Sequence, residues 1–489
     1  MQERRSEVGN VGPYLARVGE ALDHMLEKGY GDPAPRREAW TAALAGPLPE
    51  EGIGADGVVD ELVGTLIPNG TRLTEPGFWS WITTGPDTVP VVAAAAASLA
   101  SPQRYMITPF NLLEELSLDW LAELCSLGKE MKGVYSSGGS VANLVALGAA
   151  RQWALERAGV DPAADGLGGR ELALYASEEA HHTVQRSAGV LGIGRSRVRR
   201  IPADEQQRMR VDALREAIAA DAAAGVLPVA VVGTAGTTNT GAVDPLQELG
   251  EIAHEHGAWF HIDGAYGLLG VLDERVESLY AGVELADSAI VDPHKWLGAP
   301  VGIAATFVRD RAILERAFTQ EPAAYLGFDD ERPIEVSLDS PGIPYMDHSV
   351  ELSSPARGVV VWSIVRELGR GGIRARIRRD NDLARRLAEH VRLHPRLELV
   401  TEPVLSICCF RYAAEGIADL DAFNETVLRR LLRETPYLPS STLVGGAYVI
   451  RPCFINARTR EEDVDGLVTA VVAIGDELRT GGEAAPQSS

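Results

Sequence analysis

The stretch SAIVDPHKW, residues 288–296, places an aspartate, a histidine and a lysine directly after a short apolar run. A second short apolar run lies upstream at residues 259–262 and ends at Asp263. Continuous apolar runs of this length are typical of strands buried on both faces, as in a parallel sheet. The two runs therefore predict two buried strands, one ending at Asp263 and the other just before Lys295.

A lysine and an aspartate at the ends of two buried strands are what a pyridoxal phosphate site requires. The lysine amine can form a Schiff base with the cofactor aldehyde. The aspartate can pair with the protonated pyridine nitrogen, which keeps the ring an electron sink. On this interpretation Lys295 and Asp263 belong to an enzyme that acts on amines or amino acids.

Short apolar runs alternate with helical patterns from about residue 130 to about residue 310. The helical stretches, such as 211–224 and 245–257, end at or near glycines, which commonly stop helices. This alternation predicts an α/β domain with a mainly parallel central sheet. The expected strands are residues 172–175, 229–233, 259–262, 288–291 and 303–308.

The sequence outside this domain predicts less regular structure. Residues 1–100 are expected to form helices and turns, including a buried alanine-rich helix at 89–100 that opens after Pro90. Residues 318–354 are rich in Pro, Asp, Glu and Ser, and a long irregular segment in a compact enzyme is often a lid. A long helix should follow residue 359. The expected domains are 1–100, 101–370 and an α+β domain at 371–479 with strands at 397–401, 405–412 and 447–451, followed by a disordered tail at 480–489.

Composition narrows the class of protein. The 489 residues are 45% apolar and 24% charged, with a net charge of −23, and so acidic a surface argues against nucleic acid and anionic membranes as partners. No signal peptide is expected, because the first residues are polar and no apolar core follows them. Scattered cysteines without a CxxC spacing predict buried free thiols, no metal site, and a reducing, cytoplasmic compartment. These cysteines are Cys125, Cys408, Cys409 and Cys453.

Three further segments carry candidate ligand groups. Residues 136–140, Ser-Ser-Gly-Gly-Ser, precede a strong helical pattern, and a glycine-rich helix start offers backbone N–H groups to an anion such as a phosphate. His181 follows a predicted strand and turn, where it could stack on a planar ring or simply cap a helix. Residues 233–238 also follow a strand and offer small and hydroxylated side chains to a ligand, or form a plain turn. His294 could donate to the phosphate or hold the lysine in place.

These segments together resemble the group II pyridoxal-dependent amino acid decarboxylases, the relatives of aromatic-amino-acid, histidine and glutamate decarboxylases. The resemblance rests on SGGS at 137–140 with ANL at 142–144, Ala180-His181, HIDGAY at 261–266 and DPHKW at 292–296, in this order. It covers roughly residues 60–470. It implies the fold-type I, aspartate aminotransferase-like architecture and a homodimer, with active sites at the subunit interface and a swapped N-terminal segment.

The resemblance also implies roles for individual residues. Lys295 would carry the cofactor and Asp263 would pair with the pyridine nitrogen. His181 would stack on one face of the ring and Ala265 would pack on the other. The phosphate would be held by Gly139, Ser140 and His294, with Thr237 near the cofactor. A lid tyrosine, Tyr325 with Tyr345 in reserve, would deliver a proton, and the substrate would meet Trp81, Thr84 and Arg357.

Two positions depart from the pattern of the family. Val141 stands where many relatives have an acidic residue, and Asp292 stands where many have asparagine. Asp292 matters more, because it adds a negative charge beside the site and can alter how a substrate carboxylate is tolerated.

The predicted function is decarboxylation of an L-amino acid, aromatic or bulky and apolar, to the amine and CO2. One alternative is another pyridoxal reaction on the same fold, either decarboxylation to an aldehyde or carbon–carbon cleavage. The other alternative is a catalytically silent scaffold. The intact set of Lys295, Asp263 and His181 argues against it.

Overall fold

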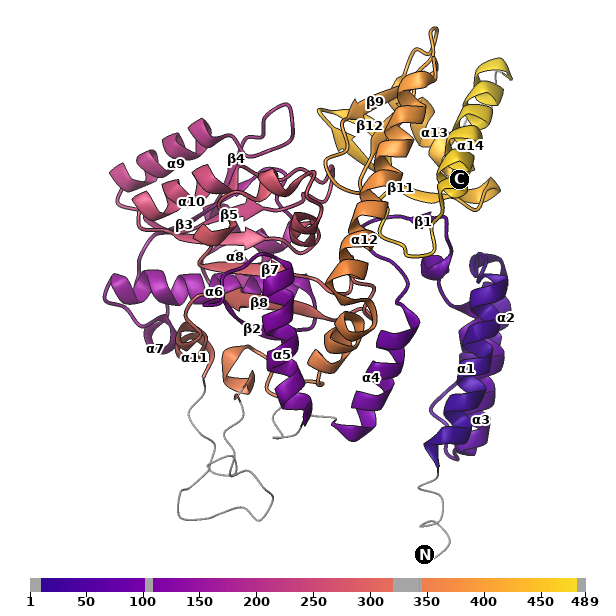
Figure 1. The fold of residues 1–489 in the computed structure, drawn as a ribbon, viewed down its shortest axis with the longest axis horizontal. Helices are drawn as coiled ribbons and strands as arrows, with labels where there is room; N and C mark the ends of the chain where they lie inside the picture. Colours follow the sequence, from indigo (N-terminus) through magenta and orange to yellow (C-terminus); the bar gives the residue numbers. More distant parts are fainter. Residues whose placement is uncertain (1–9, 102–108, 320–342, 344, 482–489) are drawn as a thin grey trace, which may run out of the picture. The chain divides into compact units, whose positions relative to one another are not determined.

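The computed structural model describes residues 10–101, 109–319, 343 and 345–481 (Figure 1). The chain divides into two compact units, residues 1–78 and 79–489. This division falls at a different place from the domain boundary expected near residue 100, and the expected assignment of three domains stays a prediction.

The first unit is built of helices and turns. Arg17 of α1 forms ion pairs with Asp56 and Asp60, which are both in α3, so these two helices are tied together. Its α-helices are α1 (Val11–Lys28), α2 (Arg37–Leu44) and α3 (Gly54–Glu61), and its shorter helical turns are Ala34–Arg36, Leu62–Leu66, Ile67–Asn69 and Arg72–Thr74.

The second unit contains a seven-stranded sheet with the order β2-β8-β7-β6-β5-β3-β4. Only β8 runs antiparallel to its neighbours, while the other recorded pairs are parallel. The mainly parallel α/β sheet predicted from the sequence is confirmed. Its strands are β2 (Lys132–Ser136), β3 (Leu172–Ser177), β4 (Val198–Ile201), β5 (Leu227–Thr234), β6 (Trp259–Asp263), β7 (Ser288–Val291) and β8 (Ala304–Val308).

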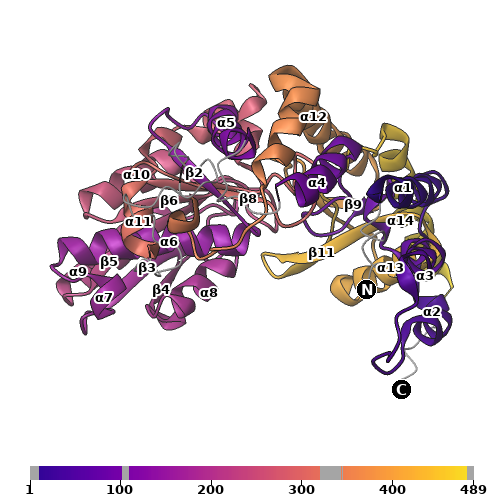
Figure 2. The same ribbon diagram turned by 90° about the horizontal axis from the view of Figure 1, so that it is seen from below.

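Helices cover both faces of this sheet, and for that reason its central strands β6, β7 and β8 are buried along their whole length. Figures 1 and 2 show α9 and α10 on one side of the strands and α6 on the other. The longer helices are α5 (Pro109–Leu124), α6 (Gly139–Arg157), α8 (Thr183–Val190), α9 (Val211–Ala223), α10 (Leu246–Glu255) and α11 (Ala312–Phe318). The shorter ones are α7 (Pro162–Asp165), Arg195–Arg197, Leu268–Leu272, Glu277–Tyr280, Val283–Leu285 and Tyr345–His348.

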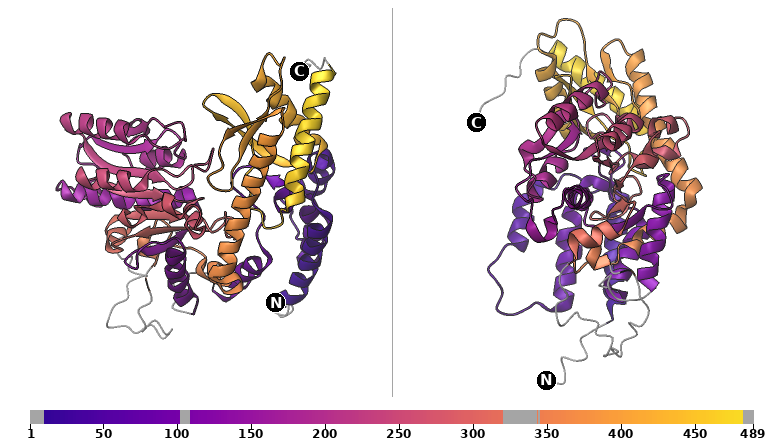
Figure 3. Two further views of the ribbon diagram at one scale, coloured as in Figure 1. Left: turned by 45° about the horizontal axis from the view of Figure 1, so that its top comes forward. Right: turned by 90° about the vertical axis from the view of Figure 1, so that its left-hand side faces the viewer.

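A long helix, α12 (Gly358–Leu393), runs from the large sheet to a smaller antiparallel sheet (Figure 3). Gly369 interrupts its helical geometry with a φ of 62°, a backbone conformation that glycine adopts without strain. Trp79, the last residue of β1 (Phe78–Trp79), packs on this part by stacking on Tyr437. The small sheet has the order β1-β11-β12-β10-β9. Its further strands and its helices are β9 (Leu397–Thr401), β10 (Cys409–Tyr412), β11 (Leu438–Val444), β12 (Ala447–Arg451), α13 (Leu420–Glu434) and α14 (Glu461–Thr480).

Two expectations for individual elements are wrong. The strand expected at 405–412 begins only at Cys409, because the backbone N–H and the hydroxyl of Ser406 are bonded to the hydroxyl of Tyr266. The helix expected to be buried at 89–100 forms as α4 (Thr88–Ala100), with Pro90 in its first turn, where proline is tolerated. Its side chains are largely exposed, however, with Val92 63% and Leu99 67% accessible.

The four cysteines are free and buried, as predicted. Most of the expected lid, and the end of the expected tail from residue 482, lie outside the described residues. Across the described ranges, no helix combines the length and apolar character needed to cross a membrane.

Candidate active site

A cavity of about 310 Å³ lies at the ends of several strands of the large sheet. Most of its lining comes from the carboxyl ends of parallel strands and the segments that follow them, because these ends meet at one edge. The rest, Val301 and Gly302, precedes the antiparallel strand β8. Seven predicted residues line it, namely Gly139, Ser140, His181, Asp263, Ala265, His294 and Lys295. The structure therefore brings together side chains that are far apart in the sequence.

The start of α6 forms a cradle for an anion in one wall. Gly138 has a φ of 132°, and a Cβ added to Gly139 would lie 2.7 Å from Oδ2 of Asp292, so a side chain at Gly139 would be forced against this carboxylate. Backbone N–H groups at a helix start attract negative charge. His294 donates from Nδ1 to the carbonyl of Ile303 at 2.8 Å, so its Nε2 can donate only when the ring is protonated.

Lys295 enters the cavity beside a buried carboxylate. Its Nζ lies 3.0 Å from Oδ2 of Asp292, whose side chain is 2% exposed. Oδ1 of Asp292 has no hydrogen-bond partner among the described residues. The departure noted in the sequence thus places a negative charge directly against the lysine.

Asp263 is held as an acceptor at the opposite wall. Its Oδ1 accepts from the backbone N–H of Ala265 at 3.2 Å, and its Oδ2 accepts from Nδ2 of Asn143 at 3.1 Å. An ionised carboxylate has further lone pairs, so it can accept another N–H from a ligand.

His181 also faces this cavity. Its Nδ1 lies 2.8 Å from the hydroxyl of Thr183. Burial lowers the pKa of His181, so the neutral imidazole is favoured. Asn143 and Thr183 also line the cavity, although neither was predicted from the sequence as a site residue. The quoted ANL motif contained the only available signal for Asn143.

The predicted site residues that do not line this cavity include Thr237, Thr84 and Arg357. Thr237 is fully buried and bonds within its own turn, to Thr240 and to the N–H of Ala242, while its neighbour Thr238 faces the cavity. Thr84 is buried and donates to the carbonyl of Gly85. Arg357 forms an ion pair with Glu351 and donates to the carbonyl of Gly302, so it supports the cavity wall from behind.

Of the two tyrosines predicted as proton donors in the lid, the structure describes only Tyr345. Tyr325 lies outside the described residues. Tyr345 is fully buried and its hydroxyl donates to Glu115 at 2.6 Å, and it is not part of the cavity lining.

A second cavity of about 540 Å³ adjoins the first and shares His181, Thr238 and Lys295 with it. Trp81, which was predicted to meet the substrate, lines it. Its other walls come from the small sheet and α13, through Leu428, Leu432, Pro439, Ser440, Ser441, Thr442 and Arg451. The buried guanidinium of Arg451 donates to the carbonyls of Trp81, Thr238 and Asn239.

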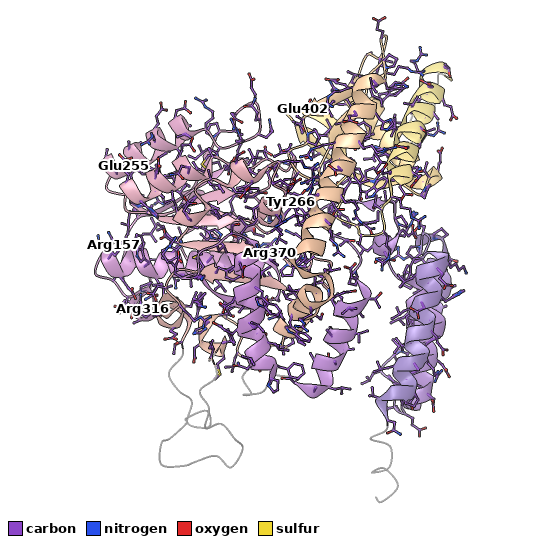
Figure 4. The ribbon with its side chains drawn as sticks, viewed as in Figure 1. Arg157, Glu255, Tyr266, Arg316, Arg370 and Glu402 are labelled. Atoms are coloured by element: carbon purple, nitrogen blue, oxygen red, sulfur yellow. The ribbon has the colours of Figure 1, made fainter. Side chains whose placement is uncertain are left out.

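The residue after Lys295 is anchored to α12. Tyr266, labelled in Figure 4, lies between the large sheet and this helix and stacks on Trp296 with ring centroids 5.1 Å apart. The indole of Trp296 donates to Oδ2 of Asp380 in α12 at 2.8 Å. The backbone that carries Lys295 is therefore fixed from two sides.

Comparisons with known proteins define the class and the family. The solved structure of an Oryza sativa TDC with PLP and tryptamine matches with a TM-score of 0.86 and 26% identity, over 96% of this chain and 98% of that one. The aromatic-L-amino-acid decarboxylase of Bacillus atrophaeus is 30% identical over 89% of this chain and 88% of its own. The L-2,4-diaminobutyrate decarboxylase of Rhizobium meliloti is 31% identical over 89% and 85%.

Fold and cavity thus define a fold-type I pyridoxal phosphate enzyme. A family model, the pyridoxal-dependent decarboxylase conserved domain, matches residues 47–413, and the chain belongs to this family. It is a carboxy-lyase of amino acids whose cofactor is pyridoxal phosphate. The residues fit that cofactor, since one cavity offers an amine, a carboxylate with open lone pairs and a glycine cradle at a helix start.

Proposed function

We propose that the protein decarboxylates a neutral amino acid with an aromatic or bulky apolar side chain, giving the amine and CO2. The observation that carries this proposal is the second cavity, which opens beside Lys295 and His181 and has room for a large side chain. The identity of the substrate goes beyond what membership of the family establishes, since the relatives include decarboxylases of both aromatic and diamino acids.

The charges around the second cavity favour a neutral side chain. Among its lining residues in the described part of the chain there is no aspartate or glutamate that could bind an ammonium group. Its one arginine, Arg451, directs its guanidinium at three backbone carbonyls. An ionic substrate side chain would therefore be buried without a partner, which is costly. Trp81 and Leu432 offer apolar surface instead.

Each cavity residue then has a proposed task toward the cofactor. Lys295 would hold it covalently, Asp263 would accept from its pyridine nitrogen, and Gly139 and Ser140 would bind its phosphate. When bound, pyridoxal phosphate supplies the electron sink for the electron pair that departing CO2 leaves behind. The cavity walls would orient the substrate relative to the bound cofactor, and this orientation would select which bond breaks.

His181 is proposed to cover one face of the ring and to hold a proton on its cavity side. Burial favours its neutral form, and a neutral imidazole beside a planar ring stacks without adding charge. Ala265, a small residue that also lines the cavity, would leave room for the other face. Tyr325 is the proposed proton donor to the product carbon.

A second copy of the chain is proposed to complete the site. Val301 lines the first cavity and is 69% exposed, and the apolar helix α4 is exposed as well. Exposed apolar surface of this kind marks an interface with another protein.

The four buried free thiols favour the cytoplasm, where thiols stay reduced.

The test is turnover of an amino acid panel by the cofactor-loaded enzyme, following CO2, oxygen and ammonia. We expect amine and CO2 without oxygen uptake from an aromatic amino acid, and at least about tenfold lower kcat/KM for diaminobutyrate and glutamate. Oxygen uptake with an aldehyde product would replace decarboxylation to the amine by the aldehyde-forming reaction. A preference for diaminobutyrate or glutamate would refute the proposed substrate class.

A further inference from the structure

We propose that Asn143 is a positioning residue that joins the carboxylate of Asp263 to the imidazole of His181, with its amide orientation set by a buried hydrogen-bond relay that begins at Trp259. The relay consists of Trp259, Ser288, His261 and Asn143. The inference rests on the function proposed above, because it gives the relay a purpose through the tasks of Asp263 and His181.

The relay starts at a group that can only donate. The indole N–H of Trp259 in β6 donates to the hydroxyl oxygen of Ser288 in β7 at 2.7 Å. The same oxygen lies 2.8 Å from Nδ1 of His261. His261 and Ser288 are paired residues of neighbouring parallel strands, and all three side chains are buried. No other acceptor for the Ser288 hydroxyl hydrogen is recorded among the described residues, so this hydrogen points at Nδ1 of His261.

The imidazole of His261 connects Ser288 to Asn143 in α6. Burial lowers the pKa of His261 to about 4, so the ring is neutral and has one donor nitrogen and one acceptor nitrogen. With Nδ1 as the acceptor, Nε2 carries the hydrogen and donates to Oδ1 of Asn143 at 3.0 Å. The amide of Asn143 must then turn its two N–H groups away from His261.

The two N–H groups of Asn143 reach two functional residues. One donates to Oδ2 of Asp263 at 3.1 Å and the other to the hydroxyl oxygen of Thr183 at 3.2 Å. Thr183 accepts from Asn143, so its own hydrogen is free to donate to Nδ1 of His181 at 2.8 Å. His181 then carries its hydrogen on Nε2. One amide thus sets both the acceptor role of Asp263 and the tautomer of His181.

The hydrogen bond to Asp263, at the other end of the relay, requires the same orientation of the Asn143 amide. An ionised Asp263 only accepts, so a flipped Asn143 would set its carbonyl oxygen against a carboxylate. It would also face His261 with a donor where Nε2–H already donates. None of the relay side chains, nor Asp263 or Thr183, is among the buried groups left without a partner. In this arrangement every donor of the relay meets an acceptor.

The first test reads the histidine tautomers in the cofactor-free protein by ¹⁵N NMR after histidine labelling, with His261→Gln and His181→Gln for assignment. We expect both rings to be neutral at pH 7 with the hydrogen on Nε2. In Asn143→Ala, His181 should become a mixture of tautomers, because Thr183 loses the donor that orients its hydroxyl. His261 should keep its hydrogen on Nε2, since Ser288 still donates to its Nδ1. Thr306→Val is the matched control, since it removes a buried hydroxyl that bonds the carbonyl of Ala142 and should change neither ring.

The second test measures the dissociation constant of pyridoxal phosphate from its absorption spectrum. Loss of a hydrogen bond to a charged group should weaken binding by about ten- to a hundredfold in Asn143→Ala. Asn143→Asp keeps the shape but faces Asp263 with a second carboxylate, and it should weaken binding at least as much. In both variants kcat should fall more than KM rises, whereas Thr306→Val should stay within about twofold of wild type.

The outcomes separate the relay from the proposed function. An Nδ1–H tautomer of His261 in the wild type, or Asn143 variants that match Thr306→Val in both measurements, would overturn the relay while leaving the cofactor site intact. Failure of the wild type to bind pyridoxal phosphate at all would instead overturn the proposed function, and with it the purpose assigned to Asn143.

Discussion

Asp263 and Asp292 are carboxylates beside the same cavity, and their surroundings give them different properties. Asp263 accepts two N–H groups from uncharged donors, Ala265 and Asn143. Asp292 pairs with the ammonium of Lys295 and keeps one oxygen without a partner among the described residues. Residue type alone does not distinguish the two, whereas their partners do.

The first prediction concerns the electron-sink role proposed for Asp263. Replacing it in Asp263→Ala removes the acceptor for the pyridine nitrogen, and kcat/KM should fall by at least about a hundredfold. Steady-state kinetics of the cofactor-loaded variant measure this effect, with Asp263→Asn as the variant that keeps the shape and loses the charge. Unchanged kinetics in both would remove the role.

The second prediction concerns the negative charge at Asp292. Its Oδ2 lies beside Gly139, in the cradle proposed for the phosphate, so it repels that dianion. Asp292→Asn should therefore bind pyridoxamine phosphate, which forms no bond to Lys295, on the order of tenfold more tightly. Calorimetric titration at two salt concentrations measures the change. Equal or weaker binding by the variant would show that the carboxylate does not oppose the phosphate.

At the scale of elements, the hydrogen bonds that join the loop after β7 to the helix α12 include a buried one from Trp296 to Asp380 and one from Arg376 to the carbonyl of Leu297. Burial raises the pKa of Asp380 to about 6, although Arg379 and Arg376 act in the opposite direction. The carboxyl group therefore binds its proton more tightly in the folded protein than in the unfolded chain.

This raised pKa has a consequence for stability. The contribution of Asp380 is fully present below its ordinary pKa of 3.8 and is lost as the pH rises through about 6. Over this window the loss is about 3 kcal/mol at most. Asp380→Asn cannot titrate, so its free energy of unfolding should fall less than that of wild type between pH 4 and 6. Urea unfolding across this range measures both slopes, and parallel slopes would contradict the assignment.

The elements that could be predicted from the sequence are those with a strong local pattern. The apolar strands β3, β5, β6, β7 and β8 were all expected close to their observed bounds. The edge strand β4 was missed because Arg199 and Arg200 interrupt its apolar pattern, and β2 because it begins with Lys132 and Gly133. Pairing in the sheet, which no local pattern records, stabilises both.

The same distinction holds within the site. Residues directly after strand ends, such as Asp263 and Lys295, came together as expected, because strand ends in a parallel sheet converge. Thr237 was chosen from a turn in which its neighbour Thr238 faces the cavity, and sequence does not say which side of a turn a side chain takes. Arg357 bonds to Gly302, and such a contact depends on tertiary packing alone.

At the scale of the whole molecule, an acidic chain with a net charge of −23 still exposes apolar side chains on α4. Val92 and Leu99 are seven positions apart, so they share one face of the helix. Like-charged molecules repel one another, and apolar surface that persists on such a protein indicates a specific contact.

We therefore expect a homodimer in solution, with a mass of twice 52.3 kDa by light scattering. The double variant Val92→Glu and Leu99→Glu should shift the mass toward the monomer and reduce activity, because charges would be buried in the contact. Val190→Glu is the matched control, since Val190 is 68% exposed on α8. A monomeric wild type, or a double variant that stays dimeric, would contradict the assignment of α4 to the interface.

The central claim is that Lys295 binds pyridoxal phosphate covalently, and borohydride trapping tests it most directly. The sequence has only three other lysines, Lys28, Lys129 and Lys132, so few amines compete. After reduction of the yellow, cofactor-loaded protein, mass spectrometry should find one phosphopyridoxyl group per chain on the peptide that contains Lys295, and none in Lys295→Ala. A colourless protein, or a label found only on another lysine, would contradict the account.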